Sequence, residues 1–539
     1  MRSKINSASA SLARPLRGHG NLHSNSASTS GFPSTQLPAS ETQAQGREHL
    51  NRPLRIMKFG GTSVGDASCI RKVADIVRAA SLETDVVVVV SAMSGVTNKL
   101  IAAALGSEAG NCSAVDAIFS ELRYRHEIAI ETLIHSDAER KRISEQMQRY
   151  FEAGERLCKG TMLLSELTPR TRDAIASLGE RLSAPLLAAV LGEIGVPSQP
   201  MEATKLIVTD SYYGAAEPWM DLTREACHAR LYPLLQQGMV PVVTGFIGAS
   251  EEGVLTTLGR GGSDYSATIL GAALDADEVI IWTDVDGLLT CDPRLVPGAS
   301  TISEISYREA SELAYFGAKV LHPKTLRPVM QRGIALRIRN TFDPENPGTQ
   351  ITPSGPASAN GVTAVTAIGE AALITIGGPG LAEVQDVLGR SCATTAAIRA
   401  DVLLISQASS QNDVCLVVPA GMAKRTVEAL RHEFAHDLVH EESEHITLDA
   451  TVAMVTVVGQ KIRRMSGILG RAFAALGRQN VDIIAGVHGA SECNISFVVA
   501  REDMDAALIA THQEFQLGAL PSPVASWYYS SEPATAEAD

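Results

Sequence analysis

The sequence predicts an α/β fold with a mostly parallel sheet, because strand-like and helix-like segments alternate along much of the chain. Residues 54–59 form a short apolar stretch that leads into a pair of glycines and then into a helix-like pattern over 66–80. Residues 85–90 read DVVVVV. A continuous β-branched run of this kind is typical of a strand that is covered on both faces of a parallel sheet.

The later elements follow the same order. Residues 114–165 are polar and charged with helical spacing, and we interpret them as a helical excursion from the sheet. Further strands are predicted at 239–246, 278–283 and 334–339, and helices at 263–274 and 307–316. In open sheets of this class, ligands bind beyond the carboxyl ends of the strands, which is where the glycine-rich loops of this chain lie.

Composition excludes several classes of protein. The chain has 539 residues, enough for two to four domains, and its 46 Lys+Arg against 60 Asp+Glu give a net charge of −14. That charge disfavours electrostatic binding to nucleic acid or to an anionic membrane. The eight cysteines include no CxxC pair and no Cys/His cluster, which argues against a zinc site and against a disulfide framework. The apolar runs are too short to span a bilayer, so we expect a soluble protein.

The first 52 residues differ from the rest. They are rich in serine, carry Arg2, Lys4, Arg14 and Arg17, and contain no acidic residue before Glu41. This composition is typical of an organelle transit peptide, but a disordered tail or a mis-assigned start codon would also explain it. If the segment is a transit peptide, we expect a plastid location, and if the protein is bacterial, a cytoplasmic one. In either case residues 1–52 are excluded from the fold prediction.

The C-terminal part predicts a separate module. Residues 344–361 are rich in proline and glycine and are interpreted as a linker after a domain at 53–343. Two units follow at 362–445 and 446–520, before a tail at 521–539, and each shows strand, glycine turn, helix, strand, strand. This internal duplication carries few ionisable groups arranged for chemistry, which favours a binding role.

Lys58 stands at a strand end immediately before a glycine turn. Gly60, Gly61 and Ser63 follow it and open a helix. Unobstructed N–H groups at a helix N-terminus bind anions, and a lysine adds a point charge for phosphate. The alternative is a tight turn with a solvent-facing lysine. The loop is not a Walker A motif, in which the lysine follows the glycines.

A second glycine loop contains Arg260 and Asp264. Arg260 could hold a carboxylate or phosphate with two hydrogen bonds, and Asp264 could orient Lys58 or simply cap the next helix. Two glycine loops with opposite charges in one sheet favour a phosphoryl-transfer site.

Two more segments could contribute to a nucleotide site. Thr283, Asp284 and Arg294 follow a predicted strand and could line a nucleotide, although aspartates beside Gly287 also form ordinary turns. Lys319 is another lysine at a predicted helix end, and taken alone it is only a charge at a helix C-terminus.

Six motifs together resemble aspartate kinase, in order, in spacing and nearly letter for letter. They are KFGGTSV at 58–64, SAMSGVTN at 91–98, SLGERLSA at 177–184, TTLGRGGSDYSA at 256–267, IWTDVDG at 281–287 and FGAKVLHP at 316–323. The resemblance runs from about 55 to about 520. It implies an amino-acid kinase fold, a carbamate-kinase-like three-layer sandwich, followed by two interlocked ferredoxin-like ACT domains that bind an end-product amino acid.

The resemblance also implies a reaction. It is the transfer of the γ-phosphoryl group of MgATP to the β-carboxylate of L-aspartate, giving 4-phospho-L-aspartate. This is the first step in the synthesis of lysine, threonine and methionine by the diaminopimelate route. A carboxylate is already a nucleophile, so the site must overcome charge repulsion and needs no general base. No tightly bound cofactor and no resident metal is expected.

Roles are implied at matching positions. Lys58 neutralises the phosphates and Asp264 organises Lys58, while Thr97, Glu180 and Arg260 contact aspartate. The implied nucleotide contacts are Lys58, Gly60, Gly61, Ser63, Thr283, Asp284, Arg294, Lys319 and Val320. One departure is Leu289, where many members of the family carry tyrosine; this puts an adenine contact in doubt.

The regulatory region resembles the kinase half of the bifunctional aspartate kinase with homoserine dehydrogenase. Lysine-sensitive members place an aspartate near Leu403 to hold the lysine ammonium group, which a leucine cannot do. Threonine is therefore preferred over lysine as the effector, with Gln407 as a candidate contact. The resemblance implies a dimer or tetramer formed through these units. No dinucleotide motif follows, so a monofunctional kinase is expected.

Three competing interpretations remain open. Another amino-acid kinase, such as glutamate or acetylglutamate kinase, would lack the duplicated C-terminal units and SLGERLSA. A ligand sensor without activity would be expected to have lost Lys58, Arg260 or Asp264, and all three are present. Residues 362–520 could also form an oligomerising module with no effector.

Overall fold

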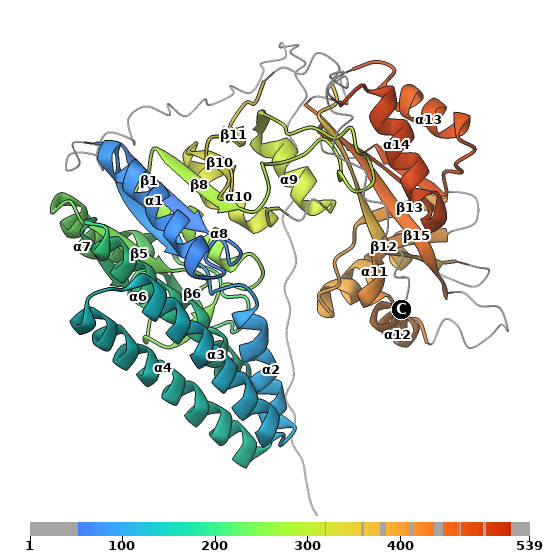
Figure 1. Cartoon of the computed structure of the whole chain (residues 1–539). Coiled ribbons are helices and arrows are strands. Elements are labelled where there is room, and N and C mark those ends of the chain that lie inside the picture. The colour runs from blue at the N-terminus through green and yellow to red at the C-terminus, as the bar shows by residue number, and fades with distance from the viewer. Residues whose placement is uncertain are drawn as a thin grey trace, which may run out of the picture. The chain divides into compact units, whose positions relative to one another are not determined.

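The computed structural model describes residues 52–317, 320–356, 361–377, 384–408, 413–435, 446–460, 462, 465–488 and 492–518 (Figure 1). The predicted N-terminal extension before residue 52, the C-terminal tail and Lys319 lie outside the described residues.

An eight-stranded sheet forms the first part of the fold. Its strand order is β3-β5-β2-β1-β8-β10-β11-β9, and every neighbouring pair is parallel except β10 with β11. The strands are β1 (Leu54–Phe59), β2 (Asp85–Val90), β3 (Ser198–Met201), β5 (Val240–Thr244), β8 (Glu278–Thr283), β9 (Glu304–Ser306), β10 (Ala335–Asn340) and β11 (Thr349–Thr352). A small second sheet contains β4 (Val208–Thr209), β6 (Ile247–Ser250) and β7 (Leu255–Thr257). The mostly parallel α/β sheet that the sequence predicts is confirmed.

Helices cover both faces of the large sheet. They are α1 (Ala67–Glu83), α2 (Val96–Glu108), α3 (Cys112–Leu133), α4 (Asp137–Leu164), α5 (Pro169–Ala176), α6 (Leu178–Glu193), α7 (Met220–Gln236), α8 (Gly262–Ala273), α9 (Tyr307–Tyr315) and α10 (Pro323–Arg332). Alternate residues of β2 enter different cores: Val88 packs in the core that includes α1 and α6, and Val89 in the core that includes α7 and α8. Burial on both faces explains why β2 is an unbroken run of valines.

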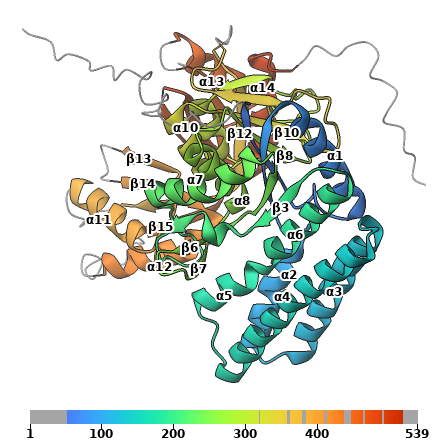
Figure 2. The same cartoon turned by 90° about the vertical axis from the view of Figure 1, so that its left-hand side faces the viewer.

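The predicted helical excursion consists of α3 and α4, which lie beside α2 (Figure 2). His126 of α3 is buried, and its Nδ1 donates to the Leu122 carbonyl oxygen at 2.7 Å. The Nε2 atom has no hydrogen-bond partner among the described residues. Burial lowers the pKa of His126 to about 4, so this histidine is neutral in the folded protein.

We expect His126 to make the protein sensitive to acid. The pKa is about 4 in the folded state against about 6.5 unfolded, so the unfolded chain binds the proton first and stability falls as pH drops from 6.5 towards 4. The full difference corresponds to about 3 kcal/mol. Urea unfolding across this range should show a steeper loss in wild type than in His126→Gln. Equal slopes for the two proteins would contradict this.

The segment Pro169–Glu193 is long and apolar enough to cross a membrane by length and composition, contrary to the sequence-based expectation for this chain. It comprises α5 and α6, and 89% of its most apolar window is buried inside the structure. Leu182, Leu186 and Val190 of α6 are fully buried in the core beneath β2. A core helix has this composition because it is apolar on all sides.

The C-terminal part is built on one six-stranded sheet with the order β13-β14-β12-β15-β17-β16. Its strands are β12 (Ala364–Ile376), β13 (Leu404–Ala408), β14 (Asp413–Pro419), β15 (Ile446–Val458), β16 (Ala485–His488) and β17 (Asn494–Ala500). The two longest strands, β12 and β15, are antiparallel neighbours, with register shifts between Ile368 and Ala371 and between Ala371 and Leu373. The second half of β12 pairs with β14, and the second half of β15 pairs with β17. Because the first half of β12 pairs with the half of β15 that carries β17, and the first half of β15 pairs with the half of β12 that carries β14, each long strand extends the sheet of the other repeat.

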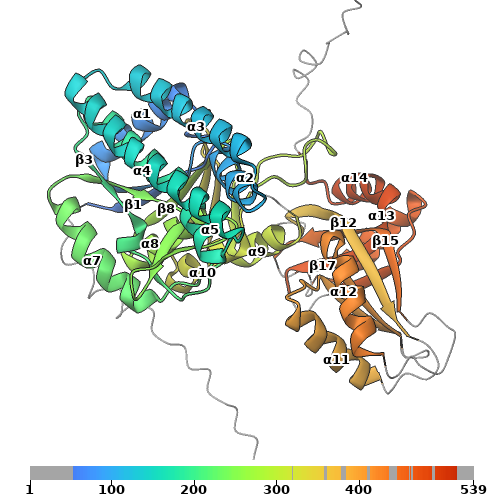
Figure 3. The ribbon, with the colours of Figure 1, turned by 90° about the horizontal axis from the view of Figure 1, so that it is seen from below.

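Each repeat carries two helices that lie side by side: α11 (Val384–Ala397) with α12 (Ala420–Glu433), and α13 (Ile468–Arg478) with α14 (Met504–Glu514) (Figure 3). The sequence pattern identified only the first helix of each pair. It also assigned 349–352 to a linker, but these residues form β11, since Thr349 and Ile351 pair with Ile338 and Leu336 of β10.

Candidate active site

A cavity of about 500 Å³ opens at the carboxyl ends of β1, β2 and β8. The loops that follow these parallel strands supply most of its wall, as expected for this class of sheet. Its lining residues are Lys58, Gly60, Gly61, Thr62, Ser91, Ala92, Met93, Ser94, Gly95, Thr97, Asn98, Glu180, Phe246, Gly259, Gly261, Gly262, Ser263, Asp264, Thr283 and Asp284.

Lys58 and Asp264 form an ion pair inside this cavity. The distance between Lys58 Nζ and Asp264 Oδ1 is 2.5 Å, and the two side chains are only 9% and 15% exposed. Lys58 is the fifth residue of β1, and Asp264 lies in the first turn of α8. The N-cap residue of α8 is Gly261, and no side chain caps this helix. Asp264 therefore pairs with the lysine and does not act as the helix cap. An ion pair this sheltered is costly to break, because the remaining charge is left without a partner.

The glycine turn after β1 is sterically tight at Gly61, where the neighbour is backbone, and less so at Gly60. A Cβ atom on Gly61 would lie 3.0 Å from the Ala92 carbonyl oxygen, and one on Gly60 would lie 3.4 Å from Lys58 Nζ. The Gly60 amide donates to the Trp282 carbonyl oxygen at 3.1 Å, which joins the turn to β8. The turn therefore presents backbone close to the lysine with no side chain between them.

Ser63 does not reach the cavity in this structure. Its side chain is fully buried, and its Oγ lies 2.7 Å from Thr341 Oγ1 and 3.4 Å from the Trp282 carbonyl oxygen. Thr62 lines the cavity instead.

Glu180 is the buried acid of the site. It lies in the first turn of α6, is 3% exposed, and its Oε2 has no hydrogen-bond partner among the described residues. Burial raises the pKa of Glu180 to about 8, against the opposing effects of backbone hydrogen bonds at Ala92 and Glu180 and of the Lys58 charge. An unpaired carboxyl that lines a cavity is suited to a cationic ligand group.

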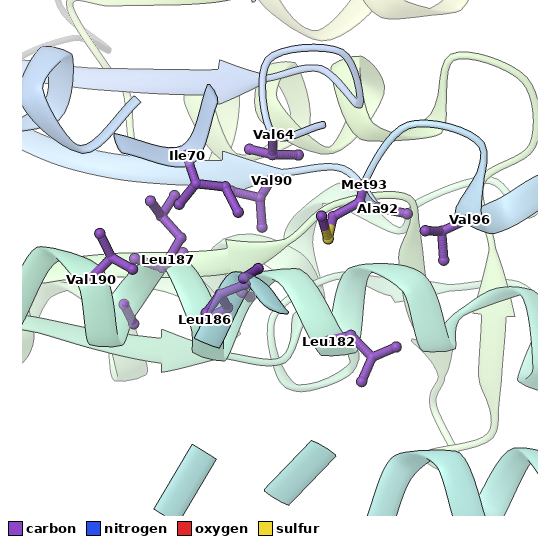
Figure 4. Packing of buried hydrophobic residues seen from close by; sticks show 14 of the residues in the cluster. Val64, Ile70, Val90, Ala92, Met93, Val96, Leu182, Leu186, Leu187 and Val190 are labelled. Atoms are coloured by element: carbon purple, nitrogen blue, oxygen red, sulfur yellow. The ribbon is translucent and has the colours of Figure 1, made fainter. Parts of the chain in front are cut away.

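The loop after β2 is packed firmly onto the core. Figure 4 shows Ala92 and Met93 beside Val64 and Val90, above the side chains of α6. A Cβ atom on Gly179 would lie 2.4 Å from Ala92 Cβ, so only glycine permits this approach of α6 to the loop. The same contact places Glu180 at the cavity wall.

Thr97, Thr283 and Asp284, which the motifs assign to ligand contacts, also line the cavity. Thr97 is in the first turn of α2, and the other two residues are at the end of β8. The Thr283 hydroxyl donates to Asp284 at 3.2 Å.

Several predicted residues do not line the cavity in this structure. Arg260 is exposed between Gly259 and Gly261, which both have positive φ, and Arg294 is exposed and paired with Asp292 at 2.6 Å. Val320 is half-buried and packs against the core on the side of α8 and α10. Leu289 makes an isolated bridge with Thr301.

Phe246 also lines the cavity, although no sequence motif marks it. Its φ is +70°, unusual for a bulky side chain, and its amide N–H donates a hydrogen bond to Ser266 Oγ at 2.9 Å. Gly262 comes so close that a Cβ there would lie 2.6 Å from the Phe246 ring. Only the glycines flanking 246 in the sequence hint at this strained turn.

The segment after β8 also contacts the C-terminal part. The Thr290 hydroxyl lies 3.0 Å from His512 Nε2 of α14, and both side chains are buried. Thr290 is six positions after Asp284, which lines the cavity. A short stretch of chain therefore connects the cavity wall to the second repeat.

The effector candidates lie on the first repeat. Gln407 is exposed on β13, where it pairs with Val414 of β14. Leu403 is half-buried and packs on a cluster that includes Phe316 and Val417.

The fold and the site define an amino-acid kinase joined to a pair of ACT domains. The model of the amino acid kinase family matches residues 53–340, and the ACT domain model matches residues 374–434 and 455–515.

Comparison with individual relatives shows which family within this class the chain resembles. The chain is 35% identical to aspartokinase 1, chloroplastic, of Arabidopsis thaliana over 85% of this chain and 80% of that protein. It is 33% identical to a bifunctional aspartokinase/homoserine dehydrogenase of Daucus carota, of which it spans 53%. The crystal structure of Escherichia coli aspartokinase III with aspartate and ADP aligns with a TM-score of 0.74 at 29% identity, over 86% of this chain and 99% of that chain. A second structure, with lysine and aspartate, aligns with a TM-score of 0.69 at 30% identity over 86% and 99%. The chain belongs to the aspartokinase family.

Proposed function

We propose that this enzyme transfers the γ-phosphoryl group of MgATP to the β-carboxylate of L-aspartate, as the first step towards lysine, threonine and methionine. The observation that carries the proposal is the sheltered Lys58–Asp264 pair, which lies beside a glycine turn and opposite an unpaired Glu180. Lys58 gives the cavity a cationic group that suits a phosphate, and Glu180 gives it an acidic group that suits the ammonium group of an amino acid.

The chemistry needs positioning more than acid–base catalysis. The β-carboxylate attacks the γ-phosphorus, and the bond from that phosphorus to the β,γ-bridging oxygen breaks to leave ADP. Lys58 reduces the repulsion between the two anions, and Asp264 fixes its ammonium group. The backbone of Gly60 and Gly61 lies beside the phosphates with no side chain in between, while the Gly60 N–H itself stays bonded to the Trp282 carbonyl oxygen, and Mg²⁺ enters with the nucleotide. Thr283 and Asp284 contact the nucleotide from β8.

Glu180 binds the ammonium group of aspartate. Its Oε2 is free of protein partners in the described part of the chain, and an ammonium ligand supplies the missing charge-assisted hydrogen bond. Arg260 lies in a loop that contains two glycines with positive φ. A movement of this loop turns the Arg260 side chain into the cavity, where it binds a carboxylate of aspartate. Arg294, Lys319 and Val320 complete the nucleotide site.

An ATP-dependent hydroxamate assay on the full chain tests this assignment. Hydroxylamine traps an acyl phosphate, so L-aspartate should give hydroxamate and L-glutamate should not. Product from glutamate would favour another amino-acid kinase. No product from folded protein that binds ATP would favour the sensor interpretation.

We propose threonine, and not lysine, as the feedback effector. The apolar packing of Leu403 places no carboxylate at the position that would hold a lysine ammonium group, while Gln407 offers an exposed amide on the next strand. Titrating both amino acids in the hydroxamate assay should show inhibition by threonine and a change below about twofold with lysine at equal concentration, since an unpaired buried ammonium is unfavourable. Inhibition by lysine alone would contradict the proposal.

We also propose that the chain forms a homo-oligomer through its C-terminal part. The outermost strands β13 and β16 contact each other, but each lacks a hydrogen-bonded partner on one edge among the described strands of that sheet, and Ile405 and Ile484 are exposed at or beside them. Such edges favour association with another copy. Light scattering tests this directly: a dimer or tetramer supports the proposal and a monomer contradicts it.

A further inference from the structure

One arginine outside the cavity connects the two loops that form its mouth. Arg125 of α3 donates from Nη1 to the Ser94 carbonyl oxygen and from Nη2 to the Gly65 carbonyl oxygen, both at 2.6 Å. Gly65 closes the turn that follows β1, and Ser94 belongs to the loop that follows β2. The guanidinium group therefore bridges the backbones of two segments that are about thirty residues apart in sequence.

These two loops carry the phosphate and substrate residues and contact each other closely. Gly61 approaches the Ala92 carbonyl oxygen, and a Cβ atom on Gly65 would lie 3.8 Å from Ser94 Cβ. Several of their backbone bonds are local, such as Gly65 N to Thr62 O at 3.2 Å. The planar fork of arginine supplies two donors in fixed geometry, so it can set the separation of two carbonyl groups in a way that a single bond cannot.

The packing of α3 fixes the position of Arg125. The neighbouring residues Leu122 and Ala129 of α3 are buried in the core, so the helix cannot shift freely. The arginine also lines a separate cavity of about 390 Å³ with Asp66, which caps α1 through the Cys69 amide. The charge of Arg125 contributes to lowering the pKa of Asp66, after the stronger effect of the backbone hydrogen bond from Cys69.

We propose that Arg125 is a positioning residue for phosphoryl transfer. It fixes the distance between the glycine turn, which binds the phosphates, and the loop that leads to Thr97, which binds aspartate. This inference rests on the proposed function. It adds a role for α3, which contributes no residue to the cavity lining.

Three variants separate this role from a general effect on folding. Arg125→Met removes both donors, and Arg125→Lys keeps the charge but loses the fork. Arg123→Met is the matched control on the same helix, because Arg123 donates to Gln148 and, at 2.7 Å, to Glu155, both on α4. Arg125→Met should lower kcat/KM for aspartate about 10- to 100-fold, because misplacing reacting groups by about 1 Å has effects of this size. Arg125→Lys should be intermediate, and Arg123→Met should stay within about twofold of wild type.

Amide hydrogen exchange without substrates gives a second readout that does not depend on activity. Residues 60–65 and 91–95 should exchange at least about tenfold faster in Arg125→Met than in wild type, while Arg123→Met leaves them unchanged. Unchanged exchange in Arg125→Met, or equal kinetics of the two methionine variants at equal thermal midpoints, would overturn the inference. If wild type fails to use aspartate, the proposed function fails, and the exchange result still tests the bridge.

Discussion

Replacing Lys58 with methionine should reduce kcat by about 10³-fold, with the protein still folded, because charge stabilisation at the transferring phosphoryl group is lost. The reduction should be in kcat more than in KM, since the lysine acts mainly where charge develops. Steady-state kinetics with saturating ATP and aspartate measure this effect.

The partner residue provides the control for Lys58. Asp264→Asn keeps the shape of the side chain that lies 2.5 Å from Lys58 Nζ but removes its charge. We expect a smaller loss than for Lys58→Met, and a double variant close to Lys58→Met alone, because the two residues act as a unit. Turnover of Lys58→Met within tenfold of wild type would contradict the assignment.

Glu180→Gln should raise KM for aspartate about 100-fold, because it removes the negative charge that pairs with the substrate ammonium group. Burial raises the pKa of Glu180 to about 8, so the free enzyme carries a protonated carboxyl at pH 7. Aspartate binding favours the ionised form and releases that proton. Between pH 6 and 8, KM for aspartate should therefore fall by up to about tenfold per pH unit in wild type.

The pH profile distinguishes an electrostatic role of Glu180 from a structural one. Glutamine is neutral at every pH, so the variant should lose the dependence as well as the affinity. Glu202, which is part-exposed and paired with Arg181, offers a control carboxylate outside the cavity. A flat wild-type profile, or the same slope in Glu180→Gln, would show that Glu180 does not bind the ammonium group.

The sequence predicted the sheet well because its central strands are short, apolar and separated by glycine turns. The bounds of β1, β2 and β8 match the predicted segments. The pattern failed where local signals conflict with tertiary pairing: β11 lies within a segment rich in proline and glycine, and it forms because β10 and β9 offer it hydrogen-bonding partners. The helix α12 was missed because it begins at the residue after β14, and α14 was missed because its apolar residues do not form a stripe along one face.

The site was predictable as far as short motifs mark it. Lys58, Asp264, Glu180 and Thr97 come together although they lie on four different elements. The burial of Ser63 against Thr341 depends on a contact across 278 residues, which no local pattern contains. The bridge made by Arg125 was hidden for the same reason, since nothing in the spacing of α3 marks one arginine among several.

Isotope transfer from the acceptor carboxylate tests the central claim most directly. The full chain is incubated with MgATP, hydroxylamine and L-aspartate labelled with ¹⁸O only in its β-carboxylate, and the released phosphate is examined by ³¹P NMR. If the β-carboxylate attacks the γ-phosphorus, hydroxylamine cleaves the acyl carbon–oxygen bond and the phosphate retains one ¹⁸O from aspartate. Phosphate without ¹⁸O would show that water, and not the β-carboxylate, accepts the phosphoryl group, and would contradict the account.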